Sequence, residues 1–345
     1  MTSVSEPLAG PVRGPDRLVQ AFRPYLTIVG AIALVAGLVA ATAGGFWLST
    51  MTSVFALSLA TLGVGVLYGR LGLVSLCQYA LVGVGGWAAL RLQFAFDLPF
   101  ELAALGGGVA AMAVGMVWGL PALRLRGLYL ALVTLMLAGA FQVVISATGF
   151  PDGGPGFLGR VAGTGRVMMA RPALVENDTA YFLYVAFVFA AGALLVEAHV
   201  RNKPGRSWAL IRKDERMAAA AGVPIVRYKL WAFALAGFVA GLSGALLAGG
   251  VGQLDGRAFS ANESVLLFVL SVVGGAYGWF GALVAGLLIR AVPALLNNAG
   301  VNGFAAMILF GAAVLHAFAT SSTGIAGQIG GLARRLGQIA TRYAR

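Results

Sequence analysis

Charged residues are scarce in this chain. They make up 10% of its 345 residues, whereas a soluble protein carries roughly a quarter. Hydrophobic residues account for 59%. This composition excludes an ordinary soluble domain and predicts an all-α polytopic membrane protein. The net charge of +12 does not indicate nucleic-acid binding, because the basic residues lie between apolar runs, as they do in the cytoplasmic loops of membrane proteins.

Residues that carry chemistry are equally few. Cys77 is the single cysteine, so no disulfide can form within the chain, and its apolar surroundings predict a packing role. His199 and His316 are far apart and have no cluster of cysteines or carboxylates beside them. No lysine follows a glycine, which excludes the Gly-Lys step of a Walker A loop. The sequence therefore predicts no catalytic residue, no metal site and no cofactor on this chain.

Carboxylates are missing from the interior of the apolar runs. Glu197 and Glu263 lie at the ends of runs, and Arg290 is the one charged residue clearly inside a run, where snorkelling to an interface is the simplest interpretation. Carriers driven by protons or ions generally use intramembrane carboxylates. We therefore expect the driving energy to come from outside this chain.

Apolar runs long enough to cross a bilayer, which takes about 17–25 residues, are abundant. They predict about ten transmembrane helices (8–10), with Gly237-x-x-x-Gly241 as one motif for close helix packing. The runs 263–278 and 281–297 are separated by a glycine-rich break, interpreted as a tight turn or a partly re-entrant segment. The expected spans are 25–44, 46–68, 72–91, 101–121, 127–147, 180–199, 228–250, 263–278, 281–297 and 303–320.

Basic residues gather on alternate connections between these spans. Such an asymmetry distinguishes cytoplasmic from external loops and places both termini in the cytoplasm. It predicts a cytoplasmic tail at 1–24, a transmembrane domain at 25–320 and a basic cytoplasmic tail at 321–345. The external loop at 148–178 is rich in glycine and proline. It is either a solvated connector or a docking surface for an external partner.

The densest group of charges lies in the segment 201–229, where eight basic residues accompany two acidic ones. Ser207 is expected to cap a helix that runs from Trp208 to about Ala221, and Gly222 is expected to end it. A short helix with a flat alanine face and a charged flank suits insertion into a cleft on a partner. A solvated amphipathic loop would have the same pattern.

The segment 205–246, GRSWALIRKDERMAAAAGVPIVRYKLWAFALAGFVAGLSGAL, resembles the cytoplasmic coupling region of branched-chain amino-acid ABC transporter permeases, the LivM family. Other segments resemble family motifs in the same order, and together the resemblance covers most of residues 50–330. These segments are 126–135 (RGLYLALVTL), 148–156, 272–281 and, faintly, 322–325. Within 72–87 the chain departs from the family motif GxLSLGHAAF, because Gln78 replaces a histidine and Cys77 replaces a glycine. The identity of the transported molecule therefore stays open.

The resemblance implies a permease subunit of a bacterial ABC importer in the inner membrane. Its partners would be a homologous LivH-like permease, two ABC ATPase subunits that use the ATP, a periplasmic or lipoprotein solute-binding protein, and membrane lipid. The substrate would be a branched-chain amino acid or a related small zwitterionic or neutral solute, such as another amino acid, an amide or urea.

The resemblance also assigns roles to individual residues. The ATPase-coupling residues would be Trp208, Arg212, Asp214, Glu215, Arg216, Met217, Ala218 and Gly222. Candidates for the lining of the pathway are Ser75, Gln78, Gly83, Gly274 and Gly275.

Two other classes of protein compete with this interpretation. A stand-alone secondary carrier or channel for a small neutral solute would explain the apolar runs, but not the missing carboxylates or the docking-type loop. A membrane-embedded enzyme would need a nucleophile with a partner base, and Ser75 and Ser271 lie in apolar runs without one.

Overall fold

The fold was analysed in a computed structural model of the chain. The structure describes residues 16–148 and 169–302, apart from 174, 176, 252–253 and 255–257, together with a few positions between 305 and 315 and the segment 324–331. These residues form helices joined by short connections, and no strand occurs among them, which confirms the all-α class.

The long helices are α1 (Asp16–Thr42), α2 (Gly45–Val64), α3 (Gln78–Phe96), α4 (Phe100–Trp118), α5 (Gly127–Thr148), α6 (Asp178–Arg201) and α9 (Ile225–Val251). The shorter ones are α7 (Lys203–Lys213), α8 (Glu215–Ala220), α10 (Ala261–Gly274), α11 (Trp279–Gly286) and α12 (Val292–Asn298). Two π-helical segments, η1 (Gly65–Arg70) and η4 (Leu287–Ala291), extend α2 and join α11 to α12, and a 3-10 turn, η2 (Leu120–Leu123), follows α4.

Within the described residues, seven helical stretches are long and apolar enough to cross a membrane. They coincide with the predicted spans 25–44, 46–68, 101–121, 127–147, 180–199, 228–250 and 281–297, with ends that differ by a few residues. The predicted span 72–91 starts late, at Gln78, because the residues before it are not helical. The predicted span 303–320 lies largely outside the described residues.

The glycine-rich break between 263 and 297 is a tight turn. α10 ends at Gly274, and the next residue, Gly275, has a φ of 114°. Residues other than glycine rarely adopt this backbone conformation. α11 then begins at Trp279. α10 has 14 residues, fewer than a full crossing needs.

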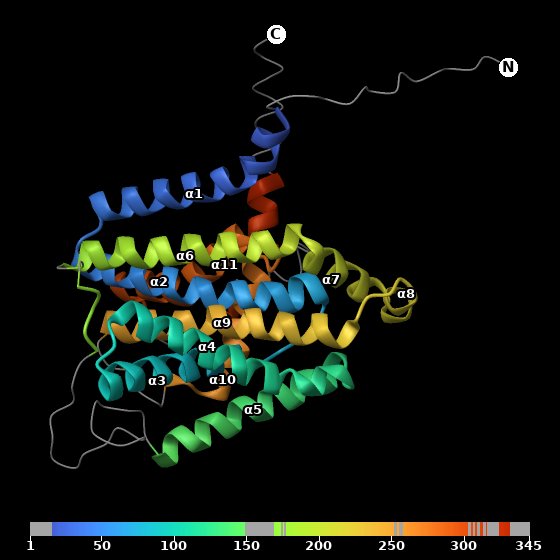
Figure 1. The fold of residues 1–345 in the computed structure, drawn as a ribbon. Coiled ribbons are helices and arrows are strands. Elements are labelled where there is room, and N and C mark those ends of the chain that lie inside the picture. The colour runs from blue at the N-terminus through green and yellow to red at the C-terminus, as the bar shows by residue number, and fades with distance from the viewer. Residues whose placement is uncertain are drawn as a thin grey trace, which may run out of the picture.

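α9 is the central helix of the bundle (Figure 1). It packs against α3 and α4 on one side and against α2 and α6 on the other. Glycines permit the close approach: a Cβ at Gly237 or Gly241 would collide with the backbone of α4, and one at Gly244 with the backbone of α3. The predicted role of the Gly237-x-x-x-Gly241 motif is therefore confirmed.

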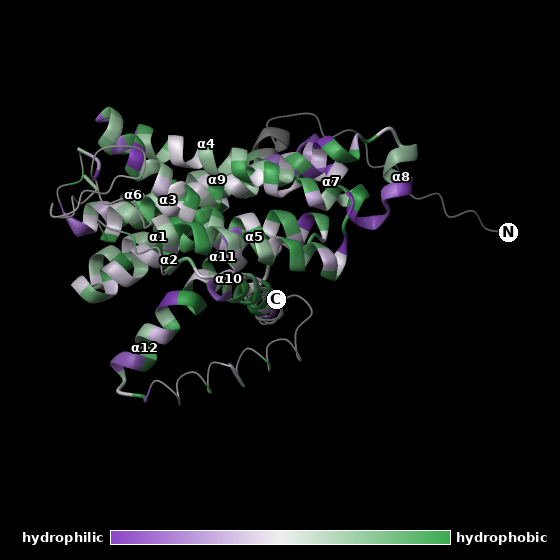
Figure 2. Ribbon diagram, turned by 90° about the horizontal axis from the view of Figure 1, so that it is seen from below, coloured by the Kyte–Doolittle hydropathy of each residue, from purple (hydrophilic) through white to green (hydrophobic). Residues whose placement is uncertain are grey.

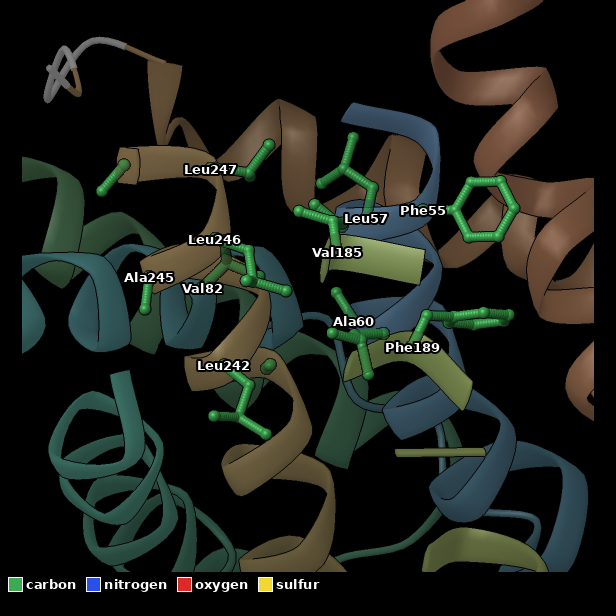
Figure 3. Packing of buried hydrophobic residues seen from close by; sticks show 14 of the residues in the cluster. Phe55, Leu57, Ala60, Val82, Val185, Phe189, Leu242, Ala245, Leu246 and Leu247 are labelled. Carbon is green, nitrogen blue, oxygen red and sulfur yellow. The ribbon is translucent and has the colours of Figure 1, made fainter. Parts of the chain in front are cut away.

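The core of the bundle is apolar and tightly interlocked (Figure 3). Phe55 of α2 meets Phe182 and Phe189 of α6 edge to face, with ring centroids 5.4 and 5.6 Å apart. Leu246 and Leu247 of α9 belong to the same buried cluster. This packing fixes the positions of the helices that carry the functional segments.

One end of the bundle carries α7 and α8, which project beyond the long helices and hold many of the hydrophilic residues (Figures 1 and 2). The start of α1 lies at the same end, because the guanidinium of Arg201, the last residue of α6, is 5.9 Å from the Tyr25 ring centroid. We call this the coupling end. The other end carries the loops that join α1 to α2 and α3 to α4.

Candidate coupling site and pathway segment

The segment 201–229 folds as two short helices rather than one. α7 starts at Lys203 with Pro204 in its first turn, and it ends at Lys213. Ser207 is buried inside α7 and caps nothing, so the predicted cap and the predicted single helix over 208–221 are wrong. Proline is well suited to the first helical turn, where the amide lacks a helical acceptor, and this moves the start of the helix upstream.

Asp214 separates the two helices. Its backbone is extended, and its carboxylate Oδ1 accepts hydrogen bonds from the amides of Arg216 (2.6 Å) and Met217 (3.1 Å) in α8. The bonds from Met217 and Arg216 favour the charged form and lower the pKa of Asp214 from its usual value. α8 ends where Gly222 adopts a φ of 74°, which confirms the predicted glycine stop.

Trp208 anchors α7 to the bundle. Its side chain is fully buried, and its Nε1 donates a hydrogen bond of 2.9 Å to the carbonyl of Tyr228 at the start of α9. Ala218 of α8 is buried in the same small core, which also contains Phe233 of α9. Trp208 and Ala218 therefore attach the two helices to α9, and Met217, which is 41% exposed, faces outward.

Glu215 joins α8 to two other elements. Its Oε1 lies 2.9 Å from Nζ of Lys229, and its Oε2 lies 2.5 Å from a guanidinium nitrogen of Arg126, just before α5. The Lys229 side chain is 1% exposed and also donates to the Ala122 carbonyl at 2.9 Å. A buried ammonium needs such a set of partners, because its desolvation is costly. Glu215 is thus a fixed connection between α8, α9 and the start of α5.

Arg212 points from α7 toward the end of α2. It donates a hydrogen bond to the Gly69 carbonyl, and its guanidinium lies 5.7 Å from the centroid of the Tyr277 ring. Arg70 donates to the Tyr277 carbonyl at 2.7 Å. Two arginines therefore tie α7 and the end of η1 to the turn between α10 and α11. By contrast, Arg216 lies at the exposed surface of α8.

A non-helical segment, residues 72–77, leads from the end of α2 back into the bundle. Gln78, the first residue of α3, donates through Nε2 to the Ala236 carbonyl at 2.7 Å. Ala236 lies eleven residues after Ile225, the first residue of α9, which is roughly 16 Å along a helix. The segment therefore crosses the interior of the bundle, where irregular backbone is tolerated only if protein or a cavity surrounds it.

The polar groups of this segment are only partly satisfied. The Leu76 amide donates to the Thr134 hydroxyl at 2.9 Å, and the Ser75 hydroxyl lies 3.3 Å from the Cys77 sulfur. Oε1 of the buried Gln78 has no hydrogen-bond partner within the described part of the chain. Buried side-chain oxygens without a hydrogen-bond partner are uncommon. Gln78 Oε1, next to an irregular segment, is therefore a candidate contact for a polar solute.

The five predicted pathway residues do not form one surface. Ser75 belongs to the irregular segment, Gln78 begins α3, and Gly83 follows in α3, where the rings of Phe141 and Phe259 lie against it. Gly274 and Gly275 pack instead against Gly281 of α11, at the turn.

Two features of the site were not expected from the sequence. Lys229 was counted with the basic loop, yet it is a buried partner in an ion pair with Glu215. The sequence signal for its burial is its position just ahead of a long apolar run. Arg171 was treated as part of the external loop, but it donates to the Gly249 carbonyl at 3.3 Å and to Asp178 at 2.6 Å. Most of the predicted docking surface in the 148–178 loop lies outside the described residues.

Comparisons with known proteins agree with this architecture. A family model described as "Branched-chain amino acid transport system / permease component" matches residues 46–318. The LivM permease of the high-affinity branched-chain amino acid transport system of Escherichia coli is 28% identical over 330 residues, covering 88% of this chain and 76% of that protein. The corresponding Salmonella typhimurium protein is 27% identical, with the same coverage.

A probable ABC transporter permease protein of Sinorhizobium fredii is 24% identical and covers 89% of this chain and 92% of its own length. No solved structure matches the chain significantly. The described helices and the family match together make the chain a multi-pass, non-catalytic membrane component. It belongs to the family of permease components of branched-chain amino acid transport systems, the membrane subunits of ABC importers.

Proposed function

We propose that this permease imports branched-chain amino acids or a related small zwitterionic or neutral solute. It would form half of a pore with a homologous, LivH-like permease. Two ATPase subunits would bind the coupling end and use the ATP, and a periplasmic or lipoprotein solute-binding protein would bind the opposite end. The names of the Escherichia coli and Salmonella typhimurium relatives support the substrate class.

The coupling end would face the cytoplasm. The basic residues of the segment 201–229 support this orientation, since positive charge is enriched on cytoplasmic loops. The start of α1 lies at the same end, beside Arg201, so the N-terminal tail at 1–24 would be cytoplasmic as well. The basic tail at 321–345 would follow the same rule.

The contact that carries the coupling proposal is the bridge from Glu215 to Lys229. An ATPase cleft would receive the exposed face of α8, which includes Met217 and Arg216. Movement of α8 would then displace Lys229 and Tyr228 in the first turns of α9 through Glu215 and Trp208. Because α9 is the central helix, a small tilt at its start would alter its packing against α3 and α4.

The pathway would pass the irregular segment at 72–77 and Gln78, the residue that follows it. Gln78 Oε1 could accept a hydrogen bond from the ammonium or amide group of a solute, because within the described chain it accepts none. A carboxamide suits a zwitterion or a neutral amide better than a charged side chain would, since it adds no net charge to the interior. The replacement of the family histidine by Gln78 would then adjust which solute passes.

The proposed function is tested by reconstituting the chain in liposomes with its partner permease, the two ATPases and the binding protein. Uptake of radiolabelled leucine is expected to require ATP and the binding protein. The competing hypothesis, a stand-alone carrier or channel, predicts uptake by this chain alone, without any ATPase. Leucine uptake under that second condition would overturn the proposal.

A further inference from the structure

A basic cavity lies at the coupling end, and Arg212 is the one predicted coupling residue among those that line it. It has a volume of about 370 Å³ and opens between the end of η1, the end of α6 and the exposed side of α7. Its lining residues are Gly69, Arg70, Val200, Gly205, Arg206, Ala209 and Arg212.

The three arginines of this cavity retain many free donors. A guanidinium has five N–H groups. Arg70 uses a donor on the Tyr277 carbonyl, and Arg212 uses one on the Gly69 carbonyl. The Arg206 side chain makes no hydrogen bond or ion pair with any other described residue. Among the described residues, the carboxylate that lies close to Arg70 is that of Glu197, and it is already paired with Arg201 at 2.6 Å.

The remaining walls suit an anion that carries an apolar body. Val200, Ala209 and Gly69 line the cavity beside the arginines. Gly205, in the first turn of α7, also lines the cavity and lies so close to the Val200 carbonyl that a Cβ would not fit. The cavity thus combines the donors of three arginines with small and apolar walls, a combination that suits the phosphate group of an amphiphile.

We propose that this cavity binds the phosphate group of an anionic phospholipid from the cytoplasmic leaflet. The cavity lies where the apolar stretches of α2 and α6 end, at the level expected for lipid headgroups. Tyr25 of α1 contacts Arg201, the residue after Val200, and the neighbouring Phe22 and Leu26 are 59% and 67% exposed. These side chains offer an apolar surface for the acyl chains. Basic pockets between transmembrane helices on the cytoplasmic side commonly bind anionic headgroups.

The test measures binding of phosphatidylglycerol to the full-length chain in phosphatidylcholine nanodiscs by native mass spectrometry. Binding is expected to be saturable and to weaken at least about tenfold in Arg206→Gln, because one charge-assisted hydrogen bond is lost. Lys213→Gln is the matched control, since it removes the same charge from the same helix outside the cavity, and it should bind like the unaltered chain. Arg70→Gln is a second variant that probes the opposite wall.

Other outcomes would overturn the proposal. Equal weakening in Arg206→Gln and Lys213→Gln would show general charge attraction in place of a site. Displacement of the lipid by millimolar inorganic phosphate or ATP would assign the cavity to a soluble phosphate. Unchanged lipid binding in Arg206→Gln, with weaker association of the ATPase subunits, would assign the cavity to an acidic surface of that partner. Arg206 is exposed and makes no internal side-chain bond among the described residues, so its replacement should leave the fold intact.

Discussion

At the scale of single residues, Glu215 has the largest structural role in the coupling site. It is 17% exposed and balances the buried Lys229, and it also pairs with Arg126. Glu215→Gln is expected to lower the free energy of unfolding by about 3 kcal/mol, because breaking a buried pair leaves a charge uncompensated. Unfolding in mixed micelles with increasing SDS measures this change.

A second substitution separates charge from packing in the same prediction. Adding Lys229→Met to Glu215→Gln should restore most of the lost stability, since the uncompensated ammonium is gone. Glu197→Gln is the control, because its i,i+4 pair with the half-exposed Arg201 should contribute about 0.5 kcal/mol. A loss in Glu215→Gln no larger than that in Glu197→Gln would contradict the role of the bridge.

Asp214 makes the order of α8 depend on pH. Its pKa is lowered in the folded chain, so the capping bonds stabilise α8 above the pKa of the unfolded state and are lost as pH falls through the lowered pKa. The protection factors of the α8 amides, which correct for the pH dependence of intrinsic exchange, should therefore fall in acid. Asp214→Asn should retain the cap but lose this pH dependence, whereas Asp214→Ala should show low protection factors at every pH. Identical pH profiles for the unaltered chain and Asp214→Asn would disprove the assignment.

At the scale of elements, the irregular segment at 72–77 depends on α5 for one of its backbone bonds. The fully buried Thr134 accepts from the Leu76 amide. Thr134→Val keeps the shape but leaves that amide without its acceptor, at a cost of about 1–3 kcal/mol. A lowered thermal midpoint and faster exchange of the Leu76 amide are expected. Thr50→Val changes a partly buried threonine on α2 that bonds its own helix; it is the matched control and should change neither.

The order of the elements was largely predictable from the sequence, and their local exceptions were not. Seven spans follow from apolar runs, and the turn after α10 follows from its glycines. The delayed start of α3 was missed, because residues 72–77 are as apolar as a span, while the Leu76 amide bonds to the Thr134 side chain and not to a helical carbonyl. The division of α7 from α8 was missed because Asp214 caps in the middle of a good helical pattern.

The candidate site was predicted better in location than in detail. The segment 201–229 was recognised from charge and from its resemblance to coupling regions. Which of its residues face inward depends on tertiary contacts that no local pattern reveals. Trp208 and Ala218 are anchors in the structure, and Lys229 is buried at the start of α9. The assignment of the outward residues to an ATPase remains a prediction.

At the scale of the whole molecule, α9 connects the proposed ATPase contact at one end of the bundle to the candidate pathway residue Gln78 in its interior. α9 is the most buried of the spanning helices, and 83% of its most apolar window lies inside the protein. Its start bonds to α7 through the Tyr228 carbonyl and to α8 through Lys229. In its middle, the Ala236 carbonyl accepts a hydrogen bond from Gln78. Movement of α8 can thus reach the candidate pathway through one rigid element.

The most direct measurement compares solute uptake with solute-stimulated ATP hydrolysis in the reconstituted importer. The variant is Gly222→Pro combined with Glu215→Arg. Proline cannot adopt the φ of 74° at Gly222 or donate its amide to Ala219, and the arginine places a cation against Lys229. Gly300→Pro is the control, since Gly300 has a φ of 72° and donates to Asn297 in the same way, far along the chain from α8.

The account predicts that both activities fall at least about tenfold in the double variant and change little in Gly300→Pro, with equal amounts of each chain in the membrane. If uptake and stimulated hydrolysis both survive in the double variant, α8 is not the site where the ATPases drive this permease.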